Sequence, residues 1–240
     1  REFGLNLVIS TPSVVFKVIT PLGQEVFIYS SSDWPEHSLI KEIQEQWVRL
    51  EVVAPVNYLG KVMEILGKLE GKYLETKYVS QERLIVVYES PLREIITGFY
   101  DQLKSISQGY ASMNYEIIGF RPGDLVKLEI LVAGRKEEAF SKIVSSQKAR
   151  QEGKMIVEKL KEILPAEQFS VALQAAVGGK IIARETIKSR RKDVTGYLYG
   201  GDYTRKRKLL EKQKKGKKEL KEKGRVNIPQ NVFLEIFKKS

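Results

Sequence analysis

Hydrophobic and polar residues alternate most regularly between Val48 and Phe120. Runs with a period of two indicate strands, whereas apolar residues spaced three and four apart indicate helices. The pattern predicts, in chain order, a strand over Val48–Ala54, a helix capped by Asn57 and running to Leu69, strands over Tyr73–Val79 and Leu84–Glu89, a helix opened by Pro91, and a strand over Tyr110–Phe120. This βαββαβ order is typical of the ferredoxin-like split βαβ sandwich, an α+β fold with both helices on one face of an antiparallel sheet.

The residues before this sandwich predict the end of another domain. Leu5–Thr11 and Val14–Thr20 alternate as strands, and residues 24–29 predict a third. Turn-forming residues around 30–35 favour a boundary. We therefore interpret residues 1–32 as the terminal strands and linker of an incomplete preceding domain, and residues 45–122 as the sandwich. The chain begins with Arg1 rather than Met, so we expect a fragment of a longer protein.

Residues 123–240 predict a mixed α/β C-terminal domain. Leu125–Val132 and Phe169–Val177 read as strands, residues 145–164 as an amphipathic helix, and Gly178-Gly179 as a turn. A basic segment over residues 180–225 follows. Within it, a charged helix is expected from Asp202 or Thr204 to Lys223.

Several classes of protein are disfavoured by composition. No run approaches the ~18 apolar residues of a membrane span. No signal-like segment opens the chain, and the absence of cysteine excludes disulfides and thiolate zinc sites. We therefore expect a cytoplasmic protein.

Enzyme motifs are incomplete in this sequence. Gly178-Gly179-Lys180 resembles the end of a phosphate-binding loop, but Ile181 replaces the metal-binding hydroxyl and Gln174 the first glycine. Asp193–Gly196 fits DxxG without the other GTPase motifs, and His37 is the only histidine. We expect no catalytic residue, metal ion or cofactor in this chain.

The positive charge is concentrated at one end. The formal net charge is +11, and residues 180–240 contain 20 Lys and Arg against 7 Asp and Glu, whereas residues 1–179 have a slight acidic excess. Such a segment, interleaved with tyrosines, is typical of RNA binding, because cations contact phosphates and aromatic rings stack on unpaired bases. The predicted RNA-binding residues are Lys180, Arg184, Lys188, Arg190, Arg191, Lys192, Tyr197, Tyr199, Tyr203, Arg205, Lys206, Arg207, Lys208, Lys212, Lys214 and Lys215.

Alternatives to this interpretation remain open. A solvated charged helix would normally be mixed in sign, which the one-sided charge does not favour. A membrane-surface helix would need a broad apolar face, which the narrow apolar stripe does not provide. Gln108–Tyr115 resembles the RNP1 motif of RNA-recognition domains, but its position on the fourth strand favours a structural role. A stand-alone RNA-binding module is the main alternative function.

Longer stretches resemble a known family of translation factors. Residues 167–240 are similar to the C-terminal domain of the LepA (elongation factor 4) family, and Gly109–Ser112 with Gly119-Phe120 resemble the last shared domain of elongation factor G. The stretches that carry the first resemblance are Gln174–Ala176, Ile181–Arg184, Arg191–Val194, Tyr199–Asp202, Arg205–Lys214, Gly216–Lys218, Pro229-Gln230 and Phe233-Leu234. Thr195–Leu198 departs from the family pattern, being bulkier and more aromatic.

The resemblance implies a ribosome-dependent GTPase whose nucleotide-binding domain, with GTP and Mg²⁺, lies upstream of this chain. It further implies a monomer that binds large-subunit rRNA and tRNA and acts in reverse translocation or fidelity of protein synthesis. The family's reported location also implies peripheral contact with the cytoplasmic face of the cell membrane.

The incomplete motifs lead to a first prediction. This chain alone should neither bind nor hydrolyse GTP, because no P-loop, base-recognition motif or Mg²⁺ ligand set can be assembled from its residues. Titration with a fluorescent GTP analogue into the high micromolar range should show no saturation. A saturable signal displaced by unlabelled GTP would contradict the prediction.

Overall fold

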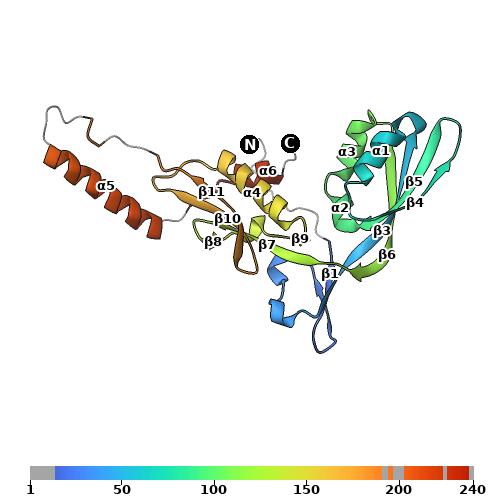
Figure 1. Cartoon of the computed structure of the whole chain (residues 1–240), viewed down its shortest axis with the longest axis horizontal. Coiled ribbons are helices and arrows are strands. Elements are labelled where there is room, and N and C mark those ends of the chain that lie inside the picture. The colour runs from blue at the N-terminus through green and yellow to red at the C-terminus, as the bar shows by residue number, and fades with distance from the viewer. Residues whose placement is uncertain (1–13, 191–193, 197–202, 224–225, 238–240) are drawn as a thin grey trace, which may run out of the picture. The chain divides into compact units, whose positions relative to one another are not determined.

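The computed structural model describes residues 14–190, 194–196, 203–223 and 226–237, and divides the chain into two compact units (Figure 1). Unit 1 comprises residues 1–124 and unit 2 residues 125–240. Each unit has its own antiparallel sheet. The division lies two residues beyond the boundary expected after residue 122.

Unit 1 contains the predicted βαββαβ sandwich and two further strands. The strand order is β2-β1-β3-β5-β4, with β6 on the other edge of β3. Its strands and α-helices are β1 (Phe16–Ile19), β2 (Glu25–Ile28), β3 (Glu42–Pro55), α1 (Leu59–Leu66), β4 (Lys72–Tyr78), β5 (Arg83–Pro91), α2 (Leu92–Ile96), α3 (Phe99–Ile106) and β6 (Ser112–Pro122).

Strand β3 is much longer than its apolar pattern predicted. Its first residues pair with β1, with Phe16 opposite Glu45, and its remainder pairs with β5 from Trp47 onward. The polar run Glu42–Gln46 concealed this extension, because few of its side chains are apolar. Strands β1 and β2, from the residues interpreted as the end of a preceding domain, join the sandwich sheet through this extension of β3.

The sandwich core lies between one face of the sheet and the three helices. Val48, Leu50 and Val52 of β3 are fully buried, as are Leu66 of α1 and Leu103 of α3. In Figure 1, α1, α2 and α3 lie on the same side of β3 and β6. The helices therefore cover one face, as the βαββαβ order predicted.

Two local details of the prediction were wrong. Asn57 does not cap the first helix, because α1 begins at Leu59 with Tyr58 as its cap and no side-chain cap bond. The helix expected after Pro91 is broken into α2 and α3 at Gly98, whose φ of 70° is left-handed. Glycine accepts that conformation without steric cost, so the chain turns there.

A buried ion cluster fixes α2 to β3. The Arg93 guanidinium donates to Glu45 at 2.7 Å and to Glu94 at 2.6 Å, and also contacts Glu70. Burial raises the pKa of Glu45, while Arg93 opposes that shift. Removing one partner of such a group leaves an uncompensated buried charge, so the cluster constrains where β3 can extend beyond the sandwich.

Unit 2 has the strand order β11-β10-β7-β8, with β9 also paired to β7. Its strands and α-helices are β7 (Leu125–Val132), β8 (Arg135–Lys136), β9 (Lys142–Ser145), α4 (Ala149–Ile163), β10 (Val171–Val177), β11 (Lys180–Ile187), α5 (Tyr203–Lys223) and α6 (Gln230–Phe237). The predicted strand at Leu125–Val132 is confirmed, and so is the basic helix ending at Lys223.

Helix α4 covers one face of the unit 2 sheet, and α6 packs against α4. Val157 and Leu160 of α4 are fully buried against Leu128 and Leu173. Helix α6 was not predicted, since it has only eight residues after Pro229, yet its Val232 is fully buried. The Phe233 ring stacks on Phe140 at 4.9 Å.

Helix α4 lies close to strand β10 at a glycine. A Cβ added to Gly153 of α4 would lie 2.8 Å from the Ala175 Cβ and 3.2 Å from Leu128 Cδ1. Real Cβ atoms do not approach so closely. Gly153 therefore sets how near α4 lies to β10.

This contact gives a prediction with a built-in control. Gly153→Ala should lower the free energy of unfolding of unit 2 by about 1–2 kcal/mol, because overpacking outweighs the ~1 kcal/mol that alanine gains in a helix. Gly216→Ala, in α5 with nothing within 4 Å, should instead raise helicity. Circular dichroism during urea unfolding measures both, and stabilisation by Gly153→Ala would contradict the packing argument.

Candidate nucleic-acid interface

The basic segment begins in a β-hairpin rather than in a loop. Gly178 and Gly179 connect β10 to β11 with φ values of 55° and 78°. Tight hairpin turns require such left-handed values, which glycine accepts readily. The first eight residues of the basic segment therefore form strand β11 at the edge of the sheet.

Alternation along β11 separates its charges by face. Glu185 faces α4 and accepts a hydrogen bond from Lys161 at 2.7 Å, and Ile187 enters the core. The hydrogen bond and the charge of Lys161 lower the pKa of Glu185, and Glu185 correspondingly raises the pKa of Lys161. Because successive side chains alternate, Arg184 lies on the opposite face. Lys188 follows β11 directly and is exposed.

A cross-strand row runs over that opposite face. Arg184 is paired with Gln174, Gln174 with Leu131, and Leu131 with Lys136 of β8. Lys136 forms an ion pair with Glu129 at 2.5 Å, so its charge is compensated locally. The positive charge of this row that is not compensated by Glu129 is therefore that of Arg184, on β11.

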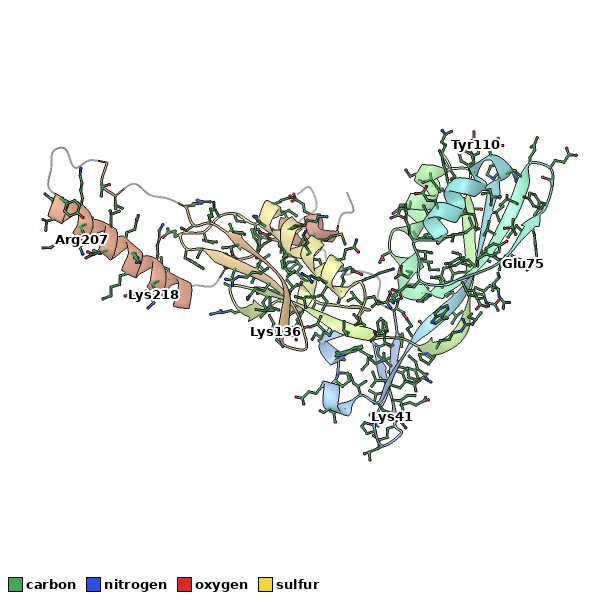
Figure 2. All side chains as sticks on the ribbon, viewed as in Figure 1. Lys41, Glu75, Tyr110, Lys136, Arg207 and Lys218 are labelled. Atoms are coloured by element: carbon green, nitrogen blue, oxygen red, sulfur yellow. The ribbon has the colours of Figure 1, made fainter. Side chains whose placement is uncertain are left out.

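Helix α5 carries half of the predicted residues, eight of sixteen. It contains eleven Lys and Arg against three Glu over 21 residues, and is ~30 Å long at the standard helical rise. Figure 2 shows Arg207 and Lys218 toward opposite ends of the helix, with side chains projecting from it. The predicted residues on α5 are Tyr203, Arg205, Lys206, Arg207, Lys208, Lys212, Lys214 and Lys215.

Few carboxylates compensate these charges. Arg207 donates to Glu211 at 3.0 Å, one helical turn away. Among the described residues, Lys208, Lys212 and Lys215 have no carboxylate partner, and all three are exposed. Exposed like charges along one helix produce a positive potential that attracts polyanions.

One side of α5 combines aromatic, apolar and basic groups. Tyr203, Lys206, Leu210 and Lys214 follow each other at helical spacing and line a hollow of about 380 Å³ together with Arg207 and Glu211. The Tyr203 side chain is 73% exposed. A flat ring beside cations suits a stacked base with neighbouring phosphates.

The structure places the predicted residues in two groups. Lys180, Arg184, Lys188 and Arg190 lie on or just after β11, and all four are exposed. The second group is the α5 set. The remaining predictions, Arg191, Lys192, Tyr197 and Tyr199, lie outside the described residues.

A residue missed by the sequence analysis connects the two groups. Lys217 of α5 donates to Ser189 Oγ at 3.2 Å and to the Arg190 carbonyl at 3.4 Å, just beyond β11. Its place within the lysine run was the available signal, but the pattern gave no reason to separate it from its neighbours. Lys217 therefore has a structural contact in addition to its charge.

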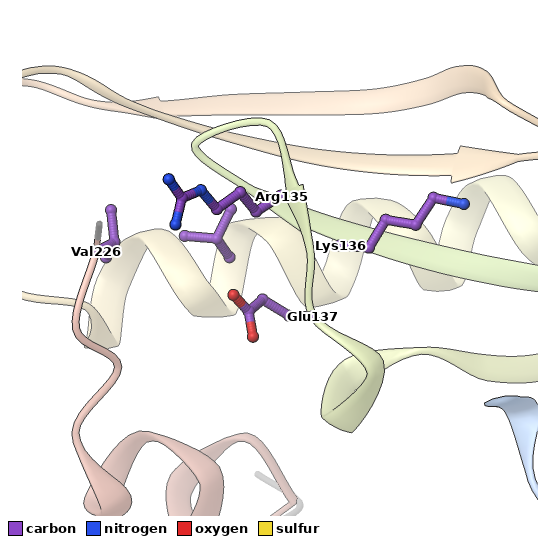
Figure 3. A pocket seen from close by; sticks show the side chains of 5 residues that line it. Arg135, Lys136, Glu137 and Val226 are labelled. Carbon is purple, nitrogen blue, oxygen red and sulfur yellow. The ribbon is translucent and has the colours of Figure 1, made fainter. Parts of the chain in front are cut away.

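A second hollow lies elsewhere in unit 2. Val132, Arg135, Lys136, Glu137 and Val226 line about 280 Å³ (Figure 3). Lys136 points away from Val226 in that view, whereas Arg135 and Glu137 point toward it. None of the predicted residues lines this pocket.

The described parts of the chain contain no cluster of three His, Cys, Asp or Glu residues that could hold a metal ion. Within the same residues, no helix is both long and apolar enough to cross a membrane.

Comparisons with known proteins cover nearly the whole chain. The family model described as Elongation factor G C-terminus matches residues 42–131, and that of GTP-binding protein LepA C-terminus matches residues 132–238. Similar curated proteins include elongation factor 4 of Thermus thermophilus, 49% identical over 239 residues, and of Oceanobacillus iheyensis, 48% identical over 238. Each alignment covers 99% of this chain but only 39% or 40% of the relative. The chain thus spans about two fifths of these relatives' length.

The two faces of unit 2 give a third prediction. Replacing Arg184 and Lys188 with Gln should weaken RNA binding and reduce the slope of log affinity against log salt by about 1.4, at ~0.7 per lost contact with single strands. Fluorescence anisotropy of a labelled single-stranded RNA measures this slope.

The matched control is Lys154→Gln with Lys161→Gln, which removes two charges from α4 on the other face. That control should leave the slope unchanged. Equal effects of the two double variants would show that only net charge matters, and would contradict the assignment to the β11 face.

Proposed function

Because the chain belongs to the elongation factor 4 (LepA) family, as its C-terminal part, we propose that it is the ribosome- and tRNA-binding region of a translation factor. The observation that carries this proposal is the exposed charge of α5, beside the basic edge of β11. Among the described residues, Lys208, Lys212 and Lys215 of this helix have no carboxylate partner. Phosphate contacts supply most of the sequence-independent affinity of proteins for nucleic acids. An rRNA or tRNA surface provides such phosphates in closely spaced rows.

The shape of α5 favours RNA over a membrane surface. An interfacial membrane helix needs a broad apolar face, which sinks into the boundary between headgroups and acyl chains. Helix α5 offers only Leu209, Leu210 and Leu220 among its 21 residues. Charge without an apolar face binds polyanions reversibly, in a manner that salt weakens.

The proposal extends to the parent protein. A ribosome-dependent GTPase domain would bind GTP and Mg²⁺ upstream, and this region would hold the factor on large-subunit rRNA and tRNA during reverse translocation or a fidelity step. Such a protein would work in the cytoplasm as a monomer, and peripheral contact with the cell membrane would be secondary.

The fourth prediction tests whether basic side chains of α5 contact RNA phosphates. If about five to eight cations contact phosphates, the salt slope for tRNA should be roughly −4 to −7, and replacing Arg205, Lys206, Arg207 and Lys208 with Gln should flatten it by about two to four. Tyr203→Ala should instead cost ~1–3 kcal/mol with the slope nearly unchanged, because stacking releases no counterions. Anisotropy titrations over a series of salt concentrations separate the two effects.

The control removes the same number of charges elsewhere. Lys41, Lys68, Lys77 and Lys154 are exposed and lie outside β11 and α5. Their combined replacement by Gln should keep the parent slope. If the α5 variant also kept it, the phosphate contacts would lie elsewhere and the site assignment would be wrong.

A further inference from the structure

Unit 1 carries an aromatic pair, half-buried Tyr58 and exposed Tyr110, that the interface in unit 2 does not use. Tyr58 lies at the start of α1, and Tyr110 lies between α3 and β6. Their rings are stacked, with centroids 6.4 Å apart and planes 25° from parallel. Tyr110 is 70% exposed, and Figure 2 shows it at the end of the unit where α1 and α3 meet the loops.

The backbone holds this pair in place. Gln108 and Gly109 both have left-handed φ values, 52° and 86°. Such a conformation is uncommon for glutamine, so the surrounding contacts must stabilise it. The Tyr58 hydroxyl donates to Gln108 Oε1 at 3.2 Å, and the Gly109 N–H donates to the Lys104 carbonyl at 2.8 Å. The outer face of Tyr110 is thereby presented to solvent in a fixed orientation.

Two lysines flank the rings. Lys61 Nζ lies 5.9 Å from the Tyr58 centroid, and Lys104 Nζ lies 3.1 Å from the Gly109 carbonyl oxygen. Lys104 Nζ also lies 5.4 Å from the ring centroid of Tyr100, another exposed tyrosine.

The carboxylates nearest in sequence form no ion pair with Lys61 or Lys104 among the described residues. Glu64 of α1 is paired with Lys68 at 2.8 Å, and Lys68 lowers the pKa of Glu64. Asp101 of α3 precedes Lys104 by three residues and forms no ion pair among the described residues. The cluster thus combines the exposed ring of Tyr110, stacked on Tyr58, with two cations.

We propose that the Tyr58–Tyr110 pair is a second RNA contact, on which an unpaired base stacks while Lys61 and Lys104 contact the adjacent phosphates. A nucleotide matches both features at once, because it joins a planar π system to an anion. Gln108–Tyr115 resembles RNP1 in sequence but not in geometry. In RNP1 the aromatic residues lie on a strand, whereas Tyr110 precedes strand β6. This inference rests on the proposed RNA-binding function but concerns the other unit.

Photo-crosslinking tests where RNA contacts the chain. Single-stranded RNA containing 4-thiouridine, irradiated with the intact chain, should crosslink to peptides containing Tyr58 or Tyr110 as well as to peptides from residues 180–223. Crosslinks confined to residues 180–223 would overturn the second contact and leave the proposed function intact. Crosslinks confined to unit 1 would support the second contact and would contradict the assignment of RNA binding to residues 180–223.

Point variants test the stacking itself. In the chain already carrying the four Gln replacements on α5, Tyr110→Ala should weaken RNA binding between about fivefold and about a hundredfold, the usual range for one stacked base. Tyr110→Phe retains the ring and should bind within about twofold of its parent, because the Tyr110 hydroxyl makes no hydrogen bond within the described part of the chain. The exposed Tyr78 on β4 provides the control, and Tyr78→Ala should have no effect.

The phosphate role has a separate signature. Lys61→Gln with Lys104→Gln should reduce the salt slope by about 1.4, whereas Tyr110→Ala should leave it unchanged. Circular dichroism confirms that each variant is folded. Unchanged affinity in Tyr110→Ala, absence of residual RNA binding in the α5 background, or binding of acidic peptides in preference to RNA would each overturn the proposal.

Discussion

Positive charge without a partner cannot be buried, and this constraint organises unit 2. Moving an uncompensated cation into a protein interior costs several kcal/mol, far more than an apolar contact returns. The 20 Lys and Arg of residues 180–240 exceed their carboxylates by 13, so most of them must remain in solvent. The core of the unit is therefore built from β7, β10, α4 and α6, which supply its buried side chains. Strand β11 is a compromise: Ile187 and Glu185 face the core and α4, while Arg184 lies on the opposite face.

In unit 1, by contrast, a positive charge is buried together with its carboxylate partners. Arg93 is buried because Glu45 and Glu94 surround it with carboxylate oxygens, and burial raises the pKa of Glu45 even so. A cluster of this kind adds little net stability but penalises arrangements that separate its members. It lies where β3 leaves the sandwich to pair with β1, and thus favours one path for that strand. In unit 1 the buried ion cluster favours one path for strand β3. In unit 2 the excess of cations keeps the basic residues in solvent.

The sequence predicted the parts of the fold in which local pattern and tertiary packing agree. Strand β7 matched residue for residue, and the six-element order of the sandwich followed from periodicity and turn residues. The misses have physical causes. The polar start of β3 and the short helix α6 depend on partners distant in sequence, which a local pattern does not contain. In the candidate interface, composition identified the basic residues, but only pairing with β10 could show that Arg184 and Glu185 lie on different faces. Tyr58 and Tyr110 are 52 positions apart in the sequence, so no local motif could reveal their pairing.

Charge and stacking make different demands on a ligand. Cations on a helix contact phosphates wherever a backbone passes, so α5 would bind many RNA surfaces with similar affinity. A ring stacks only on a base that is already unpaired, which restricts it to loops, bulges and ends. A chain that uses both would engage RNA first by charge and then retain those sites that also present a free base. The gain from two contacts is large only when one RNA reaches both at once, because the second contact then becomes intramolecular. A folded RNA with phosphate rows and exposed bases meets that condition, whereas a short uniform duplex offers the cations alone.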